Sequence, residues 1–184
     1  MNAVEIEQAI SELAEKPFDR QEFPFQFLEA FGNKETTLKR LRSGVSNKSD
    51  LGGVLQTNNI HIATCEPGQT SATIAALRTS AATAKGKVRF ILATDGDTLE
   101  AEDLTSDDPP IACAYPDFHD HFGFFLPLAG ISTIKEIAEN PIDVRATGRL
   151  NKLYVELLRE NPDWAKDERR ADMNHFMARL VFCF

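Results

Sequence analysis

GVLQTNNIHIATCEPG, residues 53–68, contains two short apolar runs on either side of Asn58-Asn59. Asparagine tolerates the backbone of a tight turn, and apolar runs on both sides of such a turn are typical of paired strands. The stretch therefore predicts a β-hairpin, with His61 as a buried or half-buried side chain of its second strand. Upstream of the hairpin, apolar residues recur at helical spacing instead, so the chain changes here from helices to a sheet.

Three helices are predicted before the hairpin. Asn2 and Glu5 have the spacing of a capping box, and apolar residues at helical spacing then continue to about Lys16. EFPFQFLEAFG, residues 22–32, has phenylalanines four positions apart, a proline in the first turn and a glycine at the end. NKETTLKRLRSG, residues 33–44, has inward leucines and also ends in glycine, which stops a helix.

The segments after the hairpin predict more sheet. SATIAALRTSAAT, residues 71–83, favours one alanine-rich helix, and GKVRFILATD, residues 86–95, is apolar on both faces, as a covered central strand is. DTLEAEDL, residues 97–104, predicts an edge strand. YPDFHDHFGFFLPLAG, residues 115–130, is aromatic and irregular, and indicates a long loop packed onto the core. Together these segments predict an α/β (α+β) fold, a mixed sheet with flanking helices.

Residues 141–184 predict helices that need a further partner. An apolar helical stripe over residues 150–158 is followed by a second stripe from Met173. Because LVFCF, residues 180–184, is apolar all round, we expect it to bury against a partner, and we expect the chain to be a fragment of a longer protein. The predicted organisation is an amino-terminal domain over residues 1–140 and the start of a helical spacer over residues 141–184.

Composition argues against secreted and membrane proteins. Apolar residues make up 42% of the chain, but none of their runs reaches the roughly 18 residues of a membrane span. The amino end is acidic rather than signal-like, so we expect a cytoplasmic location. Cys65, Cys113 and Cys183 are an odd number without CxxC spacing, which argues against a disulfide framework or a zinc module.

Charge is distributed unevenly within the net charge of −8. Residues 90–134 contain no Lys or Arg but several Asp and Glu, so that part of the chain would repel a phosphate backbone. One short basic cluster predicts contact with DNA, and its members are Lys34, Lys39, Arg40, Arg42 and Lys48. A solvated helix face is the alternative interpretation of the same cluster.

Several stretches, taken in their order, resemble the amino-terminal region of MmeI-like (type IIL) restriction-modification proteins and their methyltransferase relatives. Besides the hairpin they are FLEAFGNKETTLKRLRSG (27–44), VRFILATD (88–95), DHFGFFLPLAG (120–130), RATGRLNKLYVELL (145–158) and MNHFMARLVFCF (173–184). The resemblance implies a restriction-endonuclease-like domain and a helical spacer, followed by an adenine-specific, S-adenosylmethionine-dependent DNA methyltransferase and a target-recognition domain.

The resemblance also implies a nuclease site of the PD-(D/E)XK type, in degenerate form. Such sites place Asp on one strand and Glu-x-Lys on the next, because the carboxylates hold Mg²⁺ and the lysine helps to activate water. The matching positions here are Gly53, Ala63 and Cys65, which offer no hard oxygen ligand, so we predict neither a metal site nor phosphodiester hydrolysis. Asp50 and Glu66 would rescue the site only if the strand register shifted, which turns every side chain to the opposite face.

Two other motifs are weaker. DPPI, residues 108–111, resembles the catalytic loop of amino-methyltransferases, but Ile111 lacks the aromatic ring that stacks on a base, so a turn is the better interpretation. His119 and His121 alternate close to Cys113, as two zinc ligands would. Further ligands at the usual spacing are absent from the sequence, which favours surface or loop-packing histidines.

Three classes of function stay open. We favour a non-catalytic domain, structural or DNA-contacting, beside a downstream methyltransferase module that binds S-adenosylmethionine, with no cofactor in this part of the protein and no membrane partner. The alternative is the active Mg²⁺-dependent endonuclease domain of a type II restriction enzyme. The third class is an interaction module in phage defence that never touches DNA.

Overall fold

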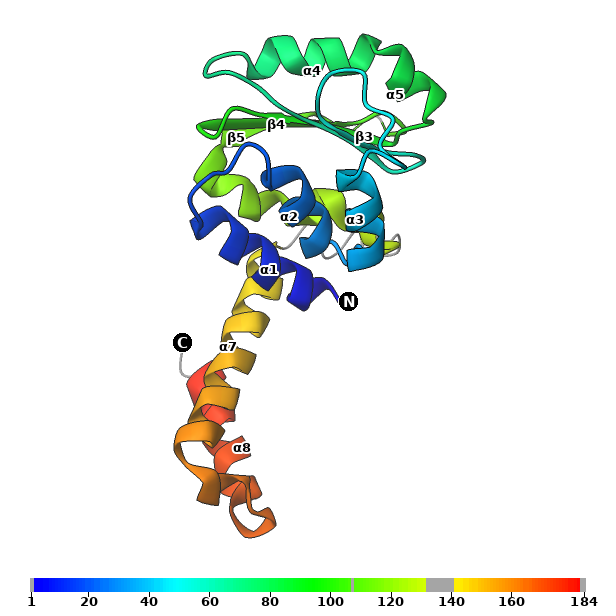
Figure 1. Cartoon of the computed structure of the whole chain (residues 1–184). Helices are drawn as coiled ribbons and strands as arrows, with labels where there is room; N and C mark the ends of the chain where they lie inside the picture. The colour runs from blue at the N-terminus through cyan, green and yellow to red at the C-terminus, as the bar shows by residue number, and fades with distance from the viewer. Residues whose placement is uncertain (1, 107, 132–140, 183–184) are drawn as a thin grey trace.

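The computed structural model describes residues 2–106, 108–131 and 141–182, and within them the sheet has five strands in sequence order. The strands are β1 (Val54–Gln56), β2 (Ile60–Thr64), β3 (Phe90–Thr94), β4 (Thr98–Asp103) and β5 (Ile111–Ala114). Only β2 and β3 run parallel, and the other neighbours are antiparallel. Helices cover both faces of this mixed sheet (Figure 1), which confirms the α+β prediction and fits a restriction-endonuclease-like fold.

The predicted hairpin joins β1 to β2. Asn58 has a φ of 59°, the left-handed conformation that asparagine tolerates better than most residues. The register pairs Val54 with Ile62 and Gln56 with Ile60. The first half of the sheet is therefore built as the sequence predicts.

The parallel pairing of β2 with β3 requires a crossover connection, because parallel strands cannot be joined by a tight turn. The crossover consists of α4 (Thr70–Thr79) and α5 (Ala81–Lys85). The single helix predicted over residues 71–83 is therefore wrong. Ser80 has an extended backbone and its Oγ accepts hydrogen bonds from the N–H groups of Ala82 and Thr83, at 3.1 and 3.2 Å, so it caps α5.

The second half of the sheet differs from the prediction in two respects. β4 is not an edge strand, because DPPI leads directly into β5, which pairs with β4 through Leu99 and Cys113. Residues 115–130 are not an irregular loop but contain the 3-10 helical segment η1 (Tyr115–Ala129). Four of its aromatic residues recur three or four positions apart, which turns them to one side and buries them in the core: Tyr115, Phe118, Phe122 and Phe125.

The larger core lies between the sheet and a layer formed by η1, α1 (Ala3–Glu15), α2 (Phe23–Ala30) and α3 (Glu35–Arg42), below the sheet in Figure 1. The predicted capping box is present at the start of α1. Phenylalanines dominate this core, and the ring centres of Phe27 and Phe125 are 5.2 Å apart. Aromatic burial on this scale fixes α2, and with it α3, against the sheet.

A smaller core fills the opposite face, beneath α4 and α5. Its buried members are Leu55, Ala63, Ile74, Leu77, Val88, Ile91 and Ala93. Because side chains alternate along a strand, β2 contributes Ile60 and Ile62 to the larger core and Ala63 to the smaller one. Both faces of β2 are therefore covered.

The helical end of the chain consists of α7 (Pro141–Glu160), η2 (Pro162–Ala165) and α8 (Asp167–Phe182). α7 packs on α1 at Gly148, and it extends away from the sheet together with α8 (Figure 1). The division after residue 140 stays a prediction, and the burial expected of LVFCF concerns side chains outside those described. No helix in the described residues is long and apolar enough to cross a membrane.

Candidate functional site

A groove of about 600 Å³ opens where the end of β2 meets α2, α3 and the loop that precedes β1. This volume lies within the roughly 300–1,000 Å³ that is usual for ligand pockets. Its lining includes Arg20, Phe25, Arg42, Gly53, Cys65 and Glu66. The groove thus contains two of the three positions that the resemblance assigns to a nuclease site, together with two arginines.

An ion pair joins Arg20 and Glu66, with Nη1 of the arginine 2.6 Å from Oε1 of the glutamate. The hydrogen bond between them raises the pKa of Arg20 and lowers the pKa of Glu66, so both side chains are charged. Thr64 Oγ1 also donates to the backbone carbonyl of Arg20, at 3.1 Å. Sequence reasoning missed Arg20 because its partner is 46 positions away, and no local pattern reports such a pairing.

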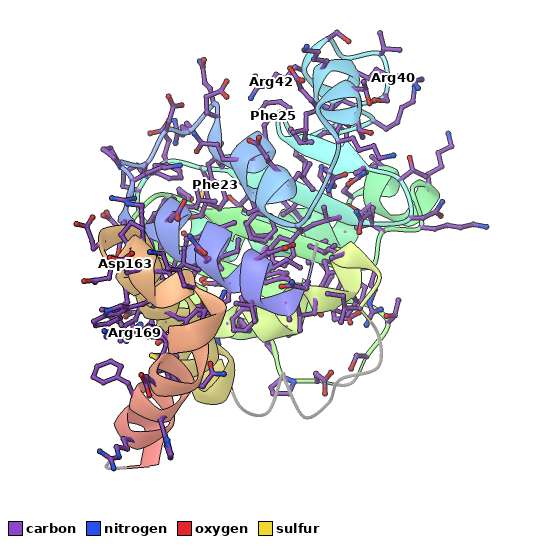
Figure 2. The ribbon with its side chains drawn as sticks, turned by 90° about the horizontal axis from the view of Figure 1, so that it is seen from below. Phe23, Phe25, Arg40, Arg42, Asp163 and Arg169 are labelled. Atoms are coloured by element: carbon purple, nitrogen blue, oxygen red, sulfur yellow. The ribbon has the colours of Figure 1, made fainter. Side chains whose placement is uncertain are left out.

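A second arginine, Arg42, pairs with Glu22, and the interacting atoms are 2.6 Å apart. Its guanidinium carbon lies 4.7 Å from the centre of the Phe25 ring, and Figure 2 shows the two side chains close together. An arginine on an aromatic face is held in orientation by the attraction between its charge and the ring. Phe25 and Glu22 were also missed, since a phenylalanine-rich helix indicates core before it indicates a site.

Gly53 approaches β2 so closely that no side chain fits there. A Cβ atom on this residue would lie 2.0 Å from the carbonyl oxygen of Ile62 and 2.9 Å from the Cα of Ala63. Asn47 holds the approach, because its Nδ2 donates to the carbonyl of Gly53 at 2.9 Å. The position that the resemblance assigns to the metal-binding aspartate is therefore closed by backbone atoms.

The other two nuclease positions lie on different sides of this structure. Ala63 is 1% exposed and belongs to the smaller core beneath α4, so it does not reach the groove. A carboxylate there would be buried among apolar side chains, at a high free-energy cost. Cys65 is half-buried and lines the groove, with its Sγ 3.9 Å from Thr70 Oγ1.

The carboxylates of Asp50 and Glu66 are committed to separate partners. Ser80 Oγ lies 2.8 and 2.9 Å from the two oxygens of Asp50, and this hydrogen bonding lowers the pKa of Asp50. Glu66 faces Arg20 instead. Within the described part of the chain, no three His, Cys, Asp or Glu side chains gather as metal ligands do. The donor groups at the groove therefore do not fit Mg²⁺.

The predicted DNA-binding residues divide between two surfaces. Arg42 lines the groove, whereas Arg40 lies about 200° around the axis of α3 and is on the other side of the helix in Figure 2. Lys39 is exposed and pairs with a glutamate one turn earlier, at 2.7 Å. Lys34 and Lys48 are exposed as well. The five residues therefore do not form one surface, and their contact with DNA stays a prediction.

His61 is fully buried, as expected, and links two elements through its ring. Its Nε2 lies 2.7 Å from Ser49 Oγ and its Nδ1 lies 2.8 Å from Thr83 Oγ1. Ser49 Oγ already accepts from the N–H groups of Leu51 and Gly53, so its own hydrogen points to Nε2 and the ring proton is on Nδ1. Burial lowers the pKa of His61 to about 4, and the neutral ring ties the loop before β1 to α5.

The two histidines of FHDHF have separate environments on η1. His119 Nδ1 is 2.7 Å from the carbonyl oxygen of Pro116, and its Nε2 is 3.2 Å from Asp120 Oδ1. His121 is exposed. Burial raises the pKa of Cys113 to about 11, which disfavours the thiolate that zinc binds. These contacts favour packing roles over a shared metal ion.

Comparisons with known proteins agree with the resemblance. The family model described as "MmeI, N-terminal domain" matches residues 1–160. A curated relative from Bacillus subtilis (strain 168), described as "DNA methyltransferase A", is 26% identical over 185 residues, which cover 100% of this chain and 20% of the relative. The chain thus spans about a fifth of the length of that relative. No solved structure matches the chain significantly.

Titration of His61 should couple stability to pH. The folded pKa of about 4 lies below the ordinary value of 6.5, so the unfolded chain binds the extra proton first as the pH falls. We expect the free energy of unfolding to decrease between pH 6.5 and 4, by up to about 3 kcal/mol. Urea unfolding across this range should show that His61→Gln removes this component and that His121→Gln, an exposed control, retains it. Equal pH dependence in both variants would contradict the assignment.

Substitution of Gly53 by alanine should destabilise the hairpin, because the added methyl group meets backbone atoms that cannot rotate away. We expect a loss of about 1–3 kcal/mol in the free energy of unfolding, the usual cost of overpacking. Thr57→Ala, an exposed change in the same hairpin, serves as the control and should stay within about 0.5 kcal/mol. Unchanged stability of Gly53→Ala would show that β1 and β2 do not approach this closely.

Proposed function

The chain belongs to the family of MmeI amino-terminal domains, and we propose that it serves a restriction-modification DNA methyltransferase as a non-catalytic, DNA-contacting domain. Because the chain spans about a fifth of its curated relative, we assign the other activities of such a protein to segments that follow the domain. These are the binding of S-adenosylmethionine and the methylation of adenine. The downstream methyltransferase module is then the domain's partner within the same protein.

The closed backbone at Gly53 is the observation that carries this proposal. A nuclease needs a carboxylate at that position to hold Mg²⁺, yet even a methyl group would lie 2.0 Å from the Ile62 carbonyl oxygen. Replacement of Gly53 by aspartate alone would therefore not restore a site, because the strands would first have to separate. We infer that the nuclease-like fold is retained for its surface and its stability rather than for hydrolysis.

The alternative is an active Mg²⁺-dependent endonuclease that uses Asp50 and Glu66. Glu66 does line the groove, but it faces Arg20, and Asp50 is hydrogen bonded to Ser80 on the α5 side of the sheet. Two carboxylates that bind one ion must share its coordination shell. Their separate partners favour the non-catalytic interpretation.

Contact with DNA is supported by where charge lies along the sheet. The groove arginines lie beside the loop that precedes β1, whereas the exposed Asp97 and Asp117 flank β4 and β5 toward the other edge, and residues 90–131 contain no Lys or Arg. A phosphate backbone would be repelled from the β4 and β5 side and accepted at the β1 side. This orientation directs the groove, rather than the opposite edge of the sheet, toward the nucleic acid.

A cutting assay separates the two interpretations. The full-length protein is incubated with plasmid DNA and Mg²⁺, with Asp50→Asn and Glu66→Gln prepared singly and Glu35→Gln as a control outside the groove. We expect all three variants to cut the plasmid no more and no less than the parent protein, because cutting should not depend on Asp50 or Glu66. Cutting that disappears in Asp50→Asn or Glu66→Gln but persists in Glu35→Gln would establish an active nuclease site.

Charge reversal on α3 tests DNA contact. The double variant Lys39→Glu/Arg40→Glu is compared with Lys85→Glu/Lys87→Glu, which changes exposed lysines on the α5 side of the sheet. Binding to a duplex of unrelated sequence is measured over a range of salt concentrations. We expect the α3 variant to bind more weakly and to reduce the slope of log affinity against log salt by about two, one per lost phosphate contact. An unchanged slope would support a domain that does not touch DNA.

A further inference from the structure

We propose that the groove binds the sugar-phosphate backbone of one DNA strand through Arg20 and Arg42, and that Glu22 and Glu66 occupy the phosphate positions when DNA is absent. This inference rests on the proposed function, because it assumes that the domain contacts DNA. It differs from the sequence-based prediction in the residues it selects. Arg20 was not in the predicted set, and Arg42 acts here apart from its neighbours on α3.

The two ion pairs have the geometry of an exchangeable phosphate contact. Arginine presents a planar fork of donors that fits a carboxylate or a phosphate equally well. The Arg20 side chain is 41% exposed and that of Glu66 is 75% exposed, so water and ligands reach the pair. The corresponding values for Arg42 and Glu22 are 47% and 43%. Ion pairs with this exposure contribute little to stability, so a phosphate can replace the carboxylate at small cost.

The two arginines are supported in different ways before any ligand arrives. The Phe25 ring supports the guanidinium of Arg42, and the hydrogen bond from Thr64 Oγ1 anchors the backbone of Arg20 to the end of β2. Side chains that are already ordered lose less conformational entropy on binding. The groove therefore provides a supported guanidinium at Arg42, and at Arg20 a cation on an anchored backbone, once the glutamates move aside.

Two exposed glycines leave space beside the groove. Gly44 and Gly52 line it, and a Cβ atom on either would meet nothing within 4 Å. Asn47 fixes the neighbouring loop, because its Oδ1 accepts from the N–H groups of Ser49 and Leu55 at 3.1 and 2.9 Å. A groove with a volume of about 600 Å³ has room for a nucleotide-sized group.

Removal of the glutamate charges tests the proposal. It should strengthen binding to DNA, whereas the loss of an ion pair with a purely structural role would not. Glu66→Gln and Glu22→Gln are made singly and together in the full-length protein. Glu102→Gln is the matched control. Glu102 lies outside the groove and also pairs with an arginine, Arg78, with 2.6 Å between the interacting atoms. The probe is a fluorescently labelled duplex of unrelated sequence, and urea unfolding confirms that each variant is folded.

We expect Glu66→Gln and Glu22→Gln each to bind the duplex about two- to fivefold more tightly than the parent protein. This range corresponds to the loss of one exposed competing ion pair. Arg20→Gln should weaken binding and reduce the salt slope by about one. Glu102→Gln should bind like the parent protein. Polyglutamate, added as a competitor, should displace the duplex less well than unlabelled DNA does, because its flexible chain loses more conformational entropy when it presents two charges to the groove at once.

Unchanged or weaker binding in both glutamate variants, with normal unfolding, would overturn the groove proposal. If Lys39→Glu/Arg40→Glu still reduced affinity in that case, DNA contact would stand and only the groove would be wrong. If no variant on α3 or in the groove changed affinity, DNA contact itself would be refuted. Competition by polyglutamate as strong as that by DNA would instead assign the groove to acidic polymers in general.

Discussion

The pairing of β2 with a neighbour on each side is the constraint on which the structure depends. β2 runs parallel to β3 and antiparallel to β1, and its side chains are buried alternately in the two cores. Because a shift of one residue would exchange those faces, the register is strongly fixed. The fixed register places Gly53 against the β2 backbone, turns His61 inward and brings Glu66 out at the groove.

The two cores carry different parts of the candidate site. The larger, phenylalanine-rich core holds α2 and α3, which supply Phe25 and Arg42. The smaller core covers Ala63, and its α4 and α5 helices anchor Asp50 and His61 through Ser80 and Thr83. Tight approach of the strands thus closes the nuclease position, while an open polar groove remains beside it. The same packing therefore closes the position of Gly53 and leaves the groove beside it open.

Local signals predicted the elements that depend on local physics. The capping box at Asn2, the three amino-terminal helices and the hairpin all have short-range patterns that the structure confirms. Ser80 was misread because it interrupts an alanine-rich run that otherwise favours helix, and only its capping hydrogen bonds reveal the break. β5 was missed because four residues after two prolines carry too little alternation to indicate a strand, although β4 offers them a partner.

The site was less predictable because its contacts are distant in sequence. The resemblance directed attention to Gly53, Ala63 and Cys65, but only the structure places Ala63 in a core and Gly53 against a carbonyl group. The pairing of Arg20 with Glu66 joins segments that no periodicity connects. Counting charges along the sequence therefore selected α3 as the candidate DNA-binding segment. It overlooked Arg20, which lines the groove together with Arg42.

The paired arginines imply a limit on how the domain would behave in a cell crowded with RNA. Two cations that already face carboxylates have little long-range attraction for a free polyanion, so the isolated domain would not be sequestered. Such a weak contact becomes effective when another module of the same protein already holds the DNA, because tethering supplies an effective concentration of about millimolar order. The groove arginines would then add to a contact that the other module has already made, rather than begin it.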